Sequence, residues 1–219
     1  MAHCHLFLPD FRKSRCSPQD DSNYVQSVAI YELAKNFLDD PDTKTFLKDR
    51  ATQDDSSGVR GAAIEELAKN FPDDPDTKTI LKNHATQDDS SGVRRSAIEE
   101  LAKNFLNDPD TKTILKDRAT HDDSSGVRRA AIQELAKNFK YDPAMFEVFY
   151  NCAANDLFEG IHDFFDEYNP RYIALDIIIK QFPQHPQTLP LLREKAENDP
   201  DEEVRKFAQK KLKQWGVQM

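Results

Sequence analysis

The sequence contains few of the residues on which disulfide frameworks, phosphate-binding loops and membrane spans depend. Its 219 residues include 3 cysteines and 6 glycines. Cys4, Cys16 and Cys152 have neither a paired nor a metal-ligand spacing, which is typical of a reducing compartment. No secretory signal is apparent, and the longest apolar run, residues 172–179, contains Asp176 and is too short to span a bilayer. We therefore predict a cytoplasmic protein without membrane contact.

Basic residues are also fewer than acidic ones. The 30 lysines and arginines are outnumbered by 39 acidic residues, which gives a formal net charge of -9 and a pI near 5.2. Nucleic-acid binding is driven by basic surfaces that release phosphate counterions, so this composition weighs against it unless a local basic patch forms. Because 38% of the residues are hydrophobic and 32% are charged, a thin, surface-rich shape is favoured over a thick globule.

What the sequence does contain is an internal repeat. The block DDSSGVRGAAIEELAKNF at Asp54 returns with small changes at Asp88 and Asp122, shifted by 34 residues each time, and a more divergent copy begins at Asp20. An insertion of nine residues then interrupts the period, which resumes at Pro170. The pattern predicts six copies of a first helix and five copies of a second helix.

Both segments of the repeat have the spacing of amphipathic helices. In the first, Val59, Ala63 and Leu67 recur at four-residue intervals, and Glu66 is among the residues expected outside this apolar stripe. The shorter second segment has Ile80, Leu81 and Ala85 as its buried set, echoed by Ile114, Leu115 and Ala119 and by Leu191, Leu192 and Ala196. One such pair cannot bury its apolar faces alone, so neighbours must stack. The expected fold is all-α: a right-handed superhelical solenoid of about five two-helix repeats plus a C-terminal capping helix.

Domain limits and helix ends follow from the same pattern. We expect one solenoid domain over residues 19–215, after an irregular segment or decayed half-repeat at 1–18 and before a tail at 216–219. Second helices are expected to begin at threonines, because Pro190 would disrupt a helix that begins at Pro186; these starts are Thr43, Thr77, Thr111 and Thr188. Aspartates predict the N-caps of the first helices, at Asp54, Asp88, Asp122 and Asp199, the last in a capping-box-like pair with Glu202.

A family resemblance rests on the element Asp-x-x-x-x-Val-Arg, at residues 54–60, 88–94, 122–128 and 199–205. This element, followed by small residues and a leucine, resembles the HEAT repeat and its phycobilisome-lyase subclass. The Asp-Pro-Asp-Thr and Leu-Lys-Asp-Arg-Ala phrases are similar to arrays of bacterial, often cyanobacterial, signalling NTPases of the NACHT kind. The resemblance covers about residues 19–215 and implies an α-solenoid, although it says little about function. Gln26 and Phe165 depart from it, where arginine and a capping aspartate are expected.

The charged residues of this element recur once per repeat. We interpret them as a structural ladder of hydrogen bonds between adjacent repeats, because structural ion-pair networks resemble functional clusters. The alternative is an extended charged binding strip. The ladder consists of Asp54, Arg60, Asp88, Arg94, Asp122, Arg128, Asp199 and Arg205.

A second recurring set is a Lys-Asn pair near the end of each first helix. Armadillo arrays, relatives of HEAT, hold an extended peptide with an asparagine ladder, because the side-chain amide both donates and accepts hydrogen bonds. Asparagine also tolerates the left-handed conformation that ends many helices. Capping is the favoured interpretation and partner binding stays open for Asn36, Asn70, Asn104 and Asn138.

The inserted loop, residues 157–169, is the least repeat-like stretch and gathers aromatic and acidic residues. Interruptions of a solenoid map to loops on one face, often the binding face. The partner-binding candidates are Phe158, His162, Phe164, Phe165 and Tyr168. Alternatively, these aromatics only cover an imperfect repeat junction. Glu159 and His162 have the spacing of a metal site, but two residues are no coordination sphere, so we expect no metal.

No catalytic pattern emerges from the remaining residues. The sequence offers no Ser-His-Asp order, no Gly-rich phosphate loop and no histidine in register with the repeat. The leading hypothesis is therefore a non-catalytic scaffold without a cofactor that binds a protein or peptide, alone or within a larger signalling protein. The resemblance leaves two alternatives: a phycobilin lyase acting on phycobiliproteins, and nucleic-acid binding as in HEAT-like glycosylases. HEAT-like hydroxylases need His-Glu pairs, which this sequence lacks.

Overall fold

The structure is a computed structural model that describes residues 23–140, 142–158 and 169–217. These residues form eleven α-helices and no strand. The first helices of the repeats are Asn23–Asn36 (α1), Ser57–Asn70 (α3), Ser91–Asn104 (α5), Ser125–Asn138 (α7), Pro170–Gln181 (α9) and Glu202–Gln214 (α11). The second helices are Pro41–Gln53 (α2), Pro75–Gln87 (α4), Pro109–His121 (α6), Met145–Asn155 (α8) and Thr188–Asn198 (α10). The predicted segment 1–18 and most of the predicted loop 157–169 lie outside the described residues.

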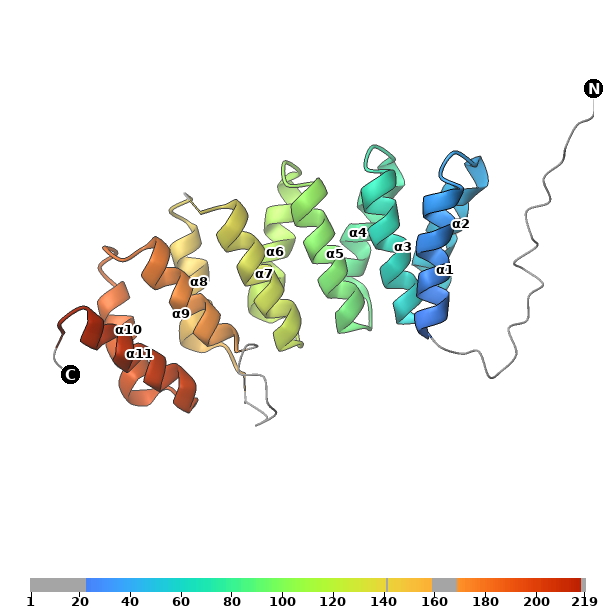
Figure 1. Cartoon of the computed structure of the whole chain (residues 1–219). Coiled ribbons are helices and arrows are strands. Elements are labelled where there is room, and N and C mark those ends of the chain that lie inside the picture. Colours follow the sequence, from blue (N-terminus) through green and yellow to red (C-terminus); the bar gives the residue numbers. More distant parts are fainter. Residues whose placement is uncertain (1–22, 141, 159–168, 218–219) are drawn as a thin grey trace, which may run out of the picture.

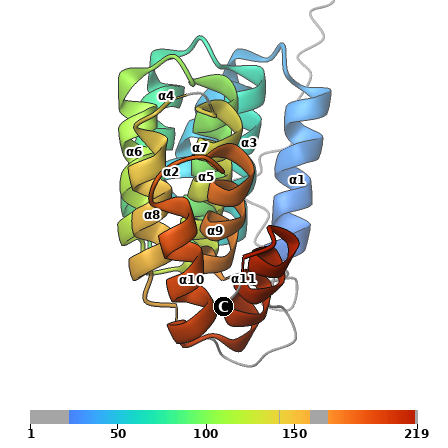
Figure 2. The ribbon, with the colours of Figure 1, turned by 90° about the vertical axis from the view of Figure 1, so that its left-hand side faces the viewer.

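The helices stack in two layers along an elongated array. Figure 1 shows them side by side in chain order, with α1 and α11 at opposite ends. Seen along the array in Figure 2, the second helices lie on one side and the first helices on the other. Each second helix packs against the first helix that follows it, and successive first helices pack on one another. The predicted all-α solenoid, with five second helices and six first helices of which the last is the C-terminal helix, is confirmed for the described residues.

The apolar stripes of the first helices form a core that runs the length of the array. Val59, Ala63 and Leu67 are at most 3% exposed, as are their counterparts in α5 and α7. Glu66 departs from the prediction that it lies outside the stripe, since it is only 5% exposed. Asn70 Nδ2 donates to its carboxylate at 2.7 Å and Lys69 Nζ lies 3.2 Å away, so the buried charge is paired and hydrogen-bonded.

The second helices begin two residues earlier than predicted, except for the last. Prolines at residues 41, 75 and 109 occupy the first turn, each after an N-cap aspartate that accepts a backbone N–H. Proline suits this position because its missing N–H would have no partner within the helix. Only α10 begins at its threonine, as predicted. The threonine hydroxyls instead donate to the carbonyl that follows the preceding first helix: Thr43 to Phe37, Thr111 to Phe105 and Thr188 to Phe182, at 2.6, 2.8 and 2.7 Å.

The predicted N-caps of the first helices are wrong by two residues. The N-caps of α3, α5 and α7 are serines, without a side-chain capping bond. The predicted aspartates instead end the second helices and accept the serine N–H in a local turn, at 3.0, 2.8 and 2.9 Å for Asp54, Asp88 and Asp122. At α11 the N-cap is Asp201, whose carboxylate accepts the backbone N–H of Glu203, so the predicted pair of Asp199 and Glu202 is wrong.

No helix among the described residues combines the length and the apolar character needed to cross a membrane.

Gly61 lowers the stability of α3 without a packing reason. A Cβ added at Gly61 would meet no atom within 4 Å, and Arg95 and Arg129 hold the same position in α5 and α7. Because alanine exceeds glycine in helix propensity by about 1 kcal/mol, Gly61→Ala is expected to raise the free energy of unfolding by about 1 kcal/mol in urea titrations. Gly216→Ala is the matched control: its φ of 67° disfavours a side chain, so it should destabilise. A loss of stability in Gly61→Ala would contradict this account.

Candidate functional site

Each of several first helices carries an arginine that reaches into the next repeat. Arg94 Nε and Nη2 donate to the two carboxylate oxygens of Asp122 at 2.9 and 2.8 Å, and Nη1 donates to the Asp88 carbonyl at 2.8 Å. One guanidinium therefore joins the C-terminal ends of two successive second helices. The same set of bonds links Arg60 to Asp88 and the Asp54 carbonyl, and Arg128 to Asp156 and the Asp122 carbonyl.

The ladder is maintained across the insertion. Arg171 of α9 donates to the carbonyl oxygens of Asp156 and Phe158 at 2.7 and 2.9 Å, and Nε donates to Asp199 at 3.3 Å. Asn169 is the N-cap of α9 and accepts the Arg171 N–H at 2.9 Å. Residues on both sides of the insertion are thus bound to one another, and the repeat contacts resume directly after it.

At the two ends of the array the ladder is incomplete. Gln26 stands where α1 would carry the arginine, and Asp54 is instead met by Arg50 of its own α2 at 3.0 Å. At the other end, Arg205 of α11 donates to the carbonyls of Asp199 and Pro200 at 2.6 and 3.0 Å. The divergence of the first copy thus coincides with a junction that lacks the arginine bridge.

The ladder carboxylates are buried yet ionised. The side chains of Asp88 and Asp122 are 4% and 1% exposed. Burial by itself raises the pKa of Asp88, but hydrogen bonds from Arg60, the Ser90 N–H and His84 outweigh it and lower the pKa to about 2. At Asp122, burial also raises the pKa, and Arg94 leads the groups that lower it overall. Because these charges are paired inside the fold, they hold the repeats in register. Little of their charge is accessible to a ligand.

The second-helix layer has bridges of its own, made by lysines. Asp108, the N-cap of α6, is held by Lys78 at 2.7 Å and by Lys82 at 2.8 Å, and Lys82 also lies 2.8 Å from Asp110. Lys44 and Lys48 of α2 hold Asp74, the N-cap of α4, in the same way. Hydrogen bonds from these lysines keep the pKa of Asp74 and of Asp108 well below its usual range.

Beside these bridges, one polar side chain per repeat points outward from the second helices. Asp49, Asn83 and Asn151 are exposed, and the side chain of Asp117 is 47% exposed. We call Asp49, Asn83, Asp117 and Asn151 the second-helix row. This row was not predicted from the sequence, although its first three members directly follow the lysine of each LKD or LKN phrase, outside the apolar set of the helix. That recurrence at a polar position was the available signal.

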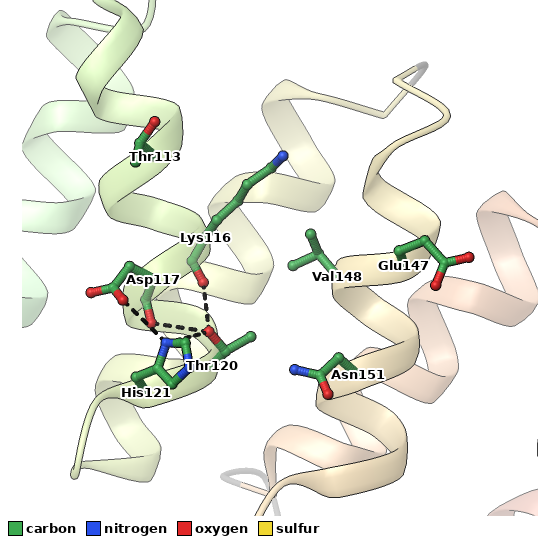
Figure 3. Close-up of a pocket in the computed structure, with 8 residues that line it drawn as sticks. All are labelled: Thr113, Lys116, Asp117, Thr120, His121, Glu147, Val148 and Asn151. Atoms are coloured by element: carbon green, nitrogen blue, oxygen red, sulfur yellow. Dashed lines mark hydrogen bonds and ion pairs between the residues drawn. The ribbon is translucent and has the colours of Figure 1, made fainter.

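An open groove lies between α6 and α8 on the same face (Figure 3). His121 Nδ1 lies 2.9 Å from Thr120 Oγ1 and 3.1 Å from Asp117 Oδ1. Asn151 Oδ1 accepts from Asn155 Nδ2 at 2.8 Å, and Figure 3 shows the Asn151 amide nitrogen turned toward α6. The residues that line the groove include Thr113, Lys116, Thr120 and His121 of α6, and Val148 and Asn151 of α8.

Residues 17–102 and 59–136 both match the model of HEAT repeats, so the matches together span residues 17–136, more than half of the 219-residue chain. The chain belongs to the HEAT-repeat family. No curated protein and no solved structure matches it significantly.

In this HEAT array the candidate asparagines are bound to their own helices. Each donates Nδ2 to the main-chain carbonyl of the glutamate four residues earlier, at 3.1 Å for Asn70 and 3.2 Å for Asn104, and to its carboxylate at 2.7 Å. No described non-glycine residue has a positive φ, so left-handed capping by asparagine is wrong. The role of partner binding stays a prediction for Asn36, Asn70, Asn104 and Asn138.

Most of the candidate residues of the inserted loop lie outside the described part of the HEAT array: Glu159, His162, Phe164, Phe165 and Tyr168. Phe158 is partly buried, and its carbonyl accepts a hydrogen bond from Arg171 of the arginine ladder. Leu157 beside it is 88% exposed. Partner binding by this loop stays a prediction. Across the described residues, no three His, Cys, Asp or Glu side chains gather in a way that would hold a metal ion.

Proposed function

We propose that this HEAT array is a non-catalytic scaffold that binds an extended segment of another protein along its second-helix face. The observation that carries the proposal is the second-helix row, which presents one amide or carboxylate per repeat at the same position of α2, α4, α6 and α8. Amides both donate and accept hydrogen bonds, and carboxylates accept them, which suits the N–H and C=O groups of an extended backbone. The arginine and lysine bridges keep these side chains in register.

The spacing of the layer supports an extended ligand. Packed helices lie about 8–10 Å apart, and an extended chain advances about 3.3 Å per residue. Each repeat therefore meets about every third residue of a bound segment. A segment of about ten residues would span the four second helices that carry the row.

Charge favours a protein partner over nucleic acid. Arg60, Arg94 and Arg128, three of the arginines that would form a basic strip, are at most 11% exposed at their side chains and are paired with aspartates. With a formal net charge of -9, the chain has no surplus of basic surface to attract phosphates. On the resemblance to NACHT-type arrays, we extend the proposal to a recognition role within a larger signalling protein.

The test uses peptides selected from a random twelve-residue phage library on the intact chain. We expect fluorescence anisotropy to show that Asn83→Ala/Asn151→Ala weakens the selected peptides about tenfold. The two lost hydrogen bonds are worth about 0.5–1.5 kcal/mol each, and about 1.4 kcal/mol corresponds to a tenfold change in Kd. Circular dichroism would verify that the variant remains folded.

The matched control is Lys103→Ala/Gln133→Ala, which removes exposed side chains from the first-helix layer, on α5 and α7. This variant should bind the selected peptides with unchanged affinity. Equal losses in both double variants would place the binding site elsewhere on the array. If the library yields no peptide, the scaffold proposal fails.

A further inference from the structure

The lysine bridges of the second-helix face are incomplete at α6. Lys48 reaches both Asp74 and Asp76, and Lys82 reaches both Asp108 and Asp110. The corresponding lysine of α6 is Lys116. Its first partner position is Asp142, which pairs with Lys112, and its second is Ala144, which has no charge.

Lys116 is therefore the lysine of this series without a close acidic partner. No described carboxylate lies within ion-pair distance of its ammonium group, and its attraction to Asp142 acts only at longer range. The acids that line the groove do not replace the missing one. Asp117 pairs with Arg118 and His121, and the carboxylate of Glu147 points away from α6 in Figure 3.

Building on the proposed function, we propose that the groove between α6 and α8 binds an acidic side chain, Asp or Glu, of the extended partner segment. Lys116 would supply the opposite charge. Figure 3 shows its ammonium group directed away from Asn151, whose amide would instead donate a hydrogen bond to the main chain of the bound segment. Val148 and the methyl groups of Thr113 and Thr120 would contact the aliphatic stem of the ligand residue.

This groove also sets the register of the bound segment. The corresponding lysines Lys48 and Lys82 are already neutralised by two aspartates each, so of these three lysines only Lys116 offers a ligand carboxylate a cation without a close acidic partner. The overall negative charge of the chain disfavours further acids in the segment. We therefore expect one preferred acidic position per ligand.

The test compares a selected twelve-residue peptide with its counterpart in which the acid is changed to the amide, Glu→Gln or Asp→Asn. Against the intact chain, fluorescence anisotropy should show about a tenfold weaker Kd for the amide peptide. Against Lys116→Gln, the two peptides should bind equally. Lys103→Gln, which changes an exposed lysine of the first-helix layer on α5, is the control, and there the tenfold preference should persist.

The outcomes separate this inference from the proposed function. Selected peptides that bind through the second-helix row but show no acid preference would overturn the inference and leave the scaffold proposal standing. An acid preference that survives in Lys116→Gln would also overturn it. Failure to select any peptide would overturn both.

Discussion

Asp122→Ala is expected to lower the free energy of unfolding by about 3–5 kcal/mol, the range for removing one partner of a buried ion pair. The Asp122 side chain is 1% exposed and accepts from Arg94, from the Ser124 N–H and from Arg118 at 3.4 Å. Without it, the Arg94 guanidinium, 8% exposed, keeps its burial but loses its main counter-ion. Urea titration followed by circular dichroism would measure the loss.

Two control variants distinguish the effect of losing the buried ion pair from the effect of losing any negative charge. Asp123 also pairs with Arg94 but is 87% exposed, so Asp123→Ala should cost less than about 1 kcal/mol, the usual limit for a surface pair. The double variant Arg94→Met/Asp122→Leu should recover at least half of the loss, because it leaves no unpaired buried charge. A cost under about 1 kcal/mol for Asp122→Ala would show that the ladder does not hold the repeats together.

Acidification is expected to produce the second large effect. The pKa values of Asp74, Asp88, Asp108 and Asp122 are lowered in the folded chain, to about 2 for Asp88. In the unfolded chain they return to about 3.9, so the unfolded state binds more protons at acidic pH. The stabilisation from these groups is present above pH 4 and is lost as the pH falls through the folded values. The Tm should be nearly constant from pH 7 to pH 5 and fall by on the order of 10 °C or more between pH 4 and pH 2.

The comparison that isolates the aspartates is a charge-neutral variant. Asp74→Asn/Asp108→Asn removes two of the lowered carboxyls, so its Tm should be lower at pH 7 but less dependent on pH below 4. Scanning calorimetry at matched ionic strength would provide both curves. Parallel curves for the variant and the original chain would mean that other groups govern the acid response.

Several features were within reach of sequence reasoning because they depend on contacts within one helix or one repeat. The four-residue spacing of Val59, Ala63 and Leu67 identifies the buried side of α3. The 34-residue period also determined the number of helices, since each copy must bury the same stripe against its neighbour. The helix starts were less accurate, because the start at Thr188, set by Pro190 in the last copy, was carried over to copies that begin with a capping Asp-Pro pair.

By itself, then, the sequence determined an all-α solenoid, its repeat unit and its core, because hydrophobic periodicity reports which side of each helix must leave water. Only the tertiary structure determined which basic side chain pairs with which acidic side chain. Arg94 pairs with an aspartate 28 residues away and Lys112 with one 30 residues away, while Lys116 is left without a close acidic partner. Such pairings depend on the offset and angle between stacked helices. For that reason, the groove beside Lys116 emerged only when the repeats were placed side by side.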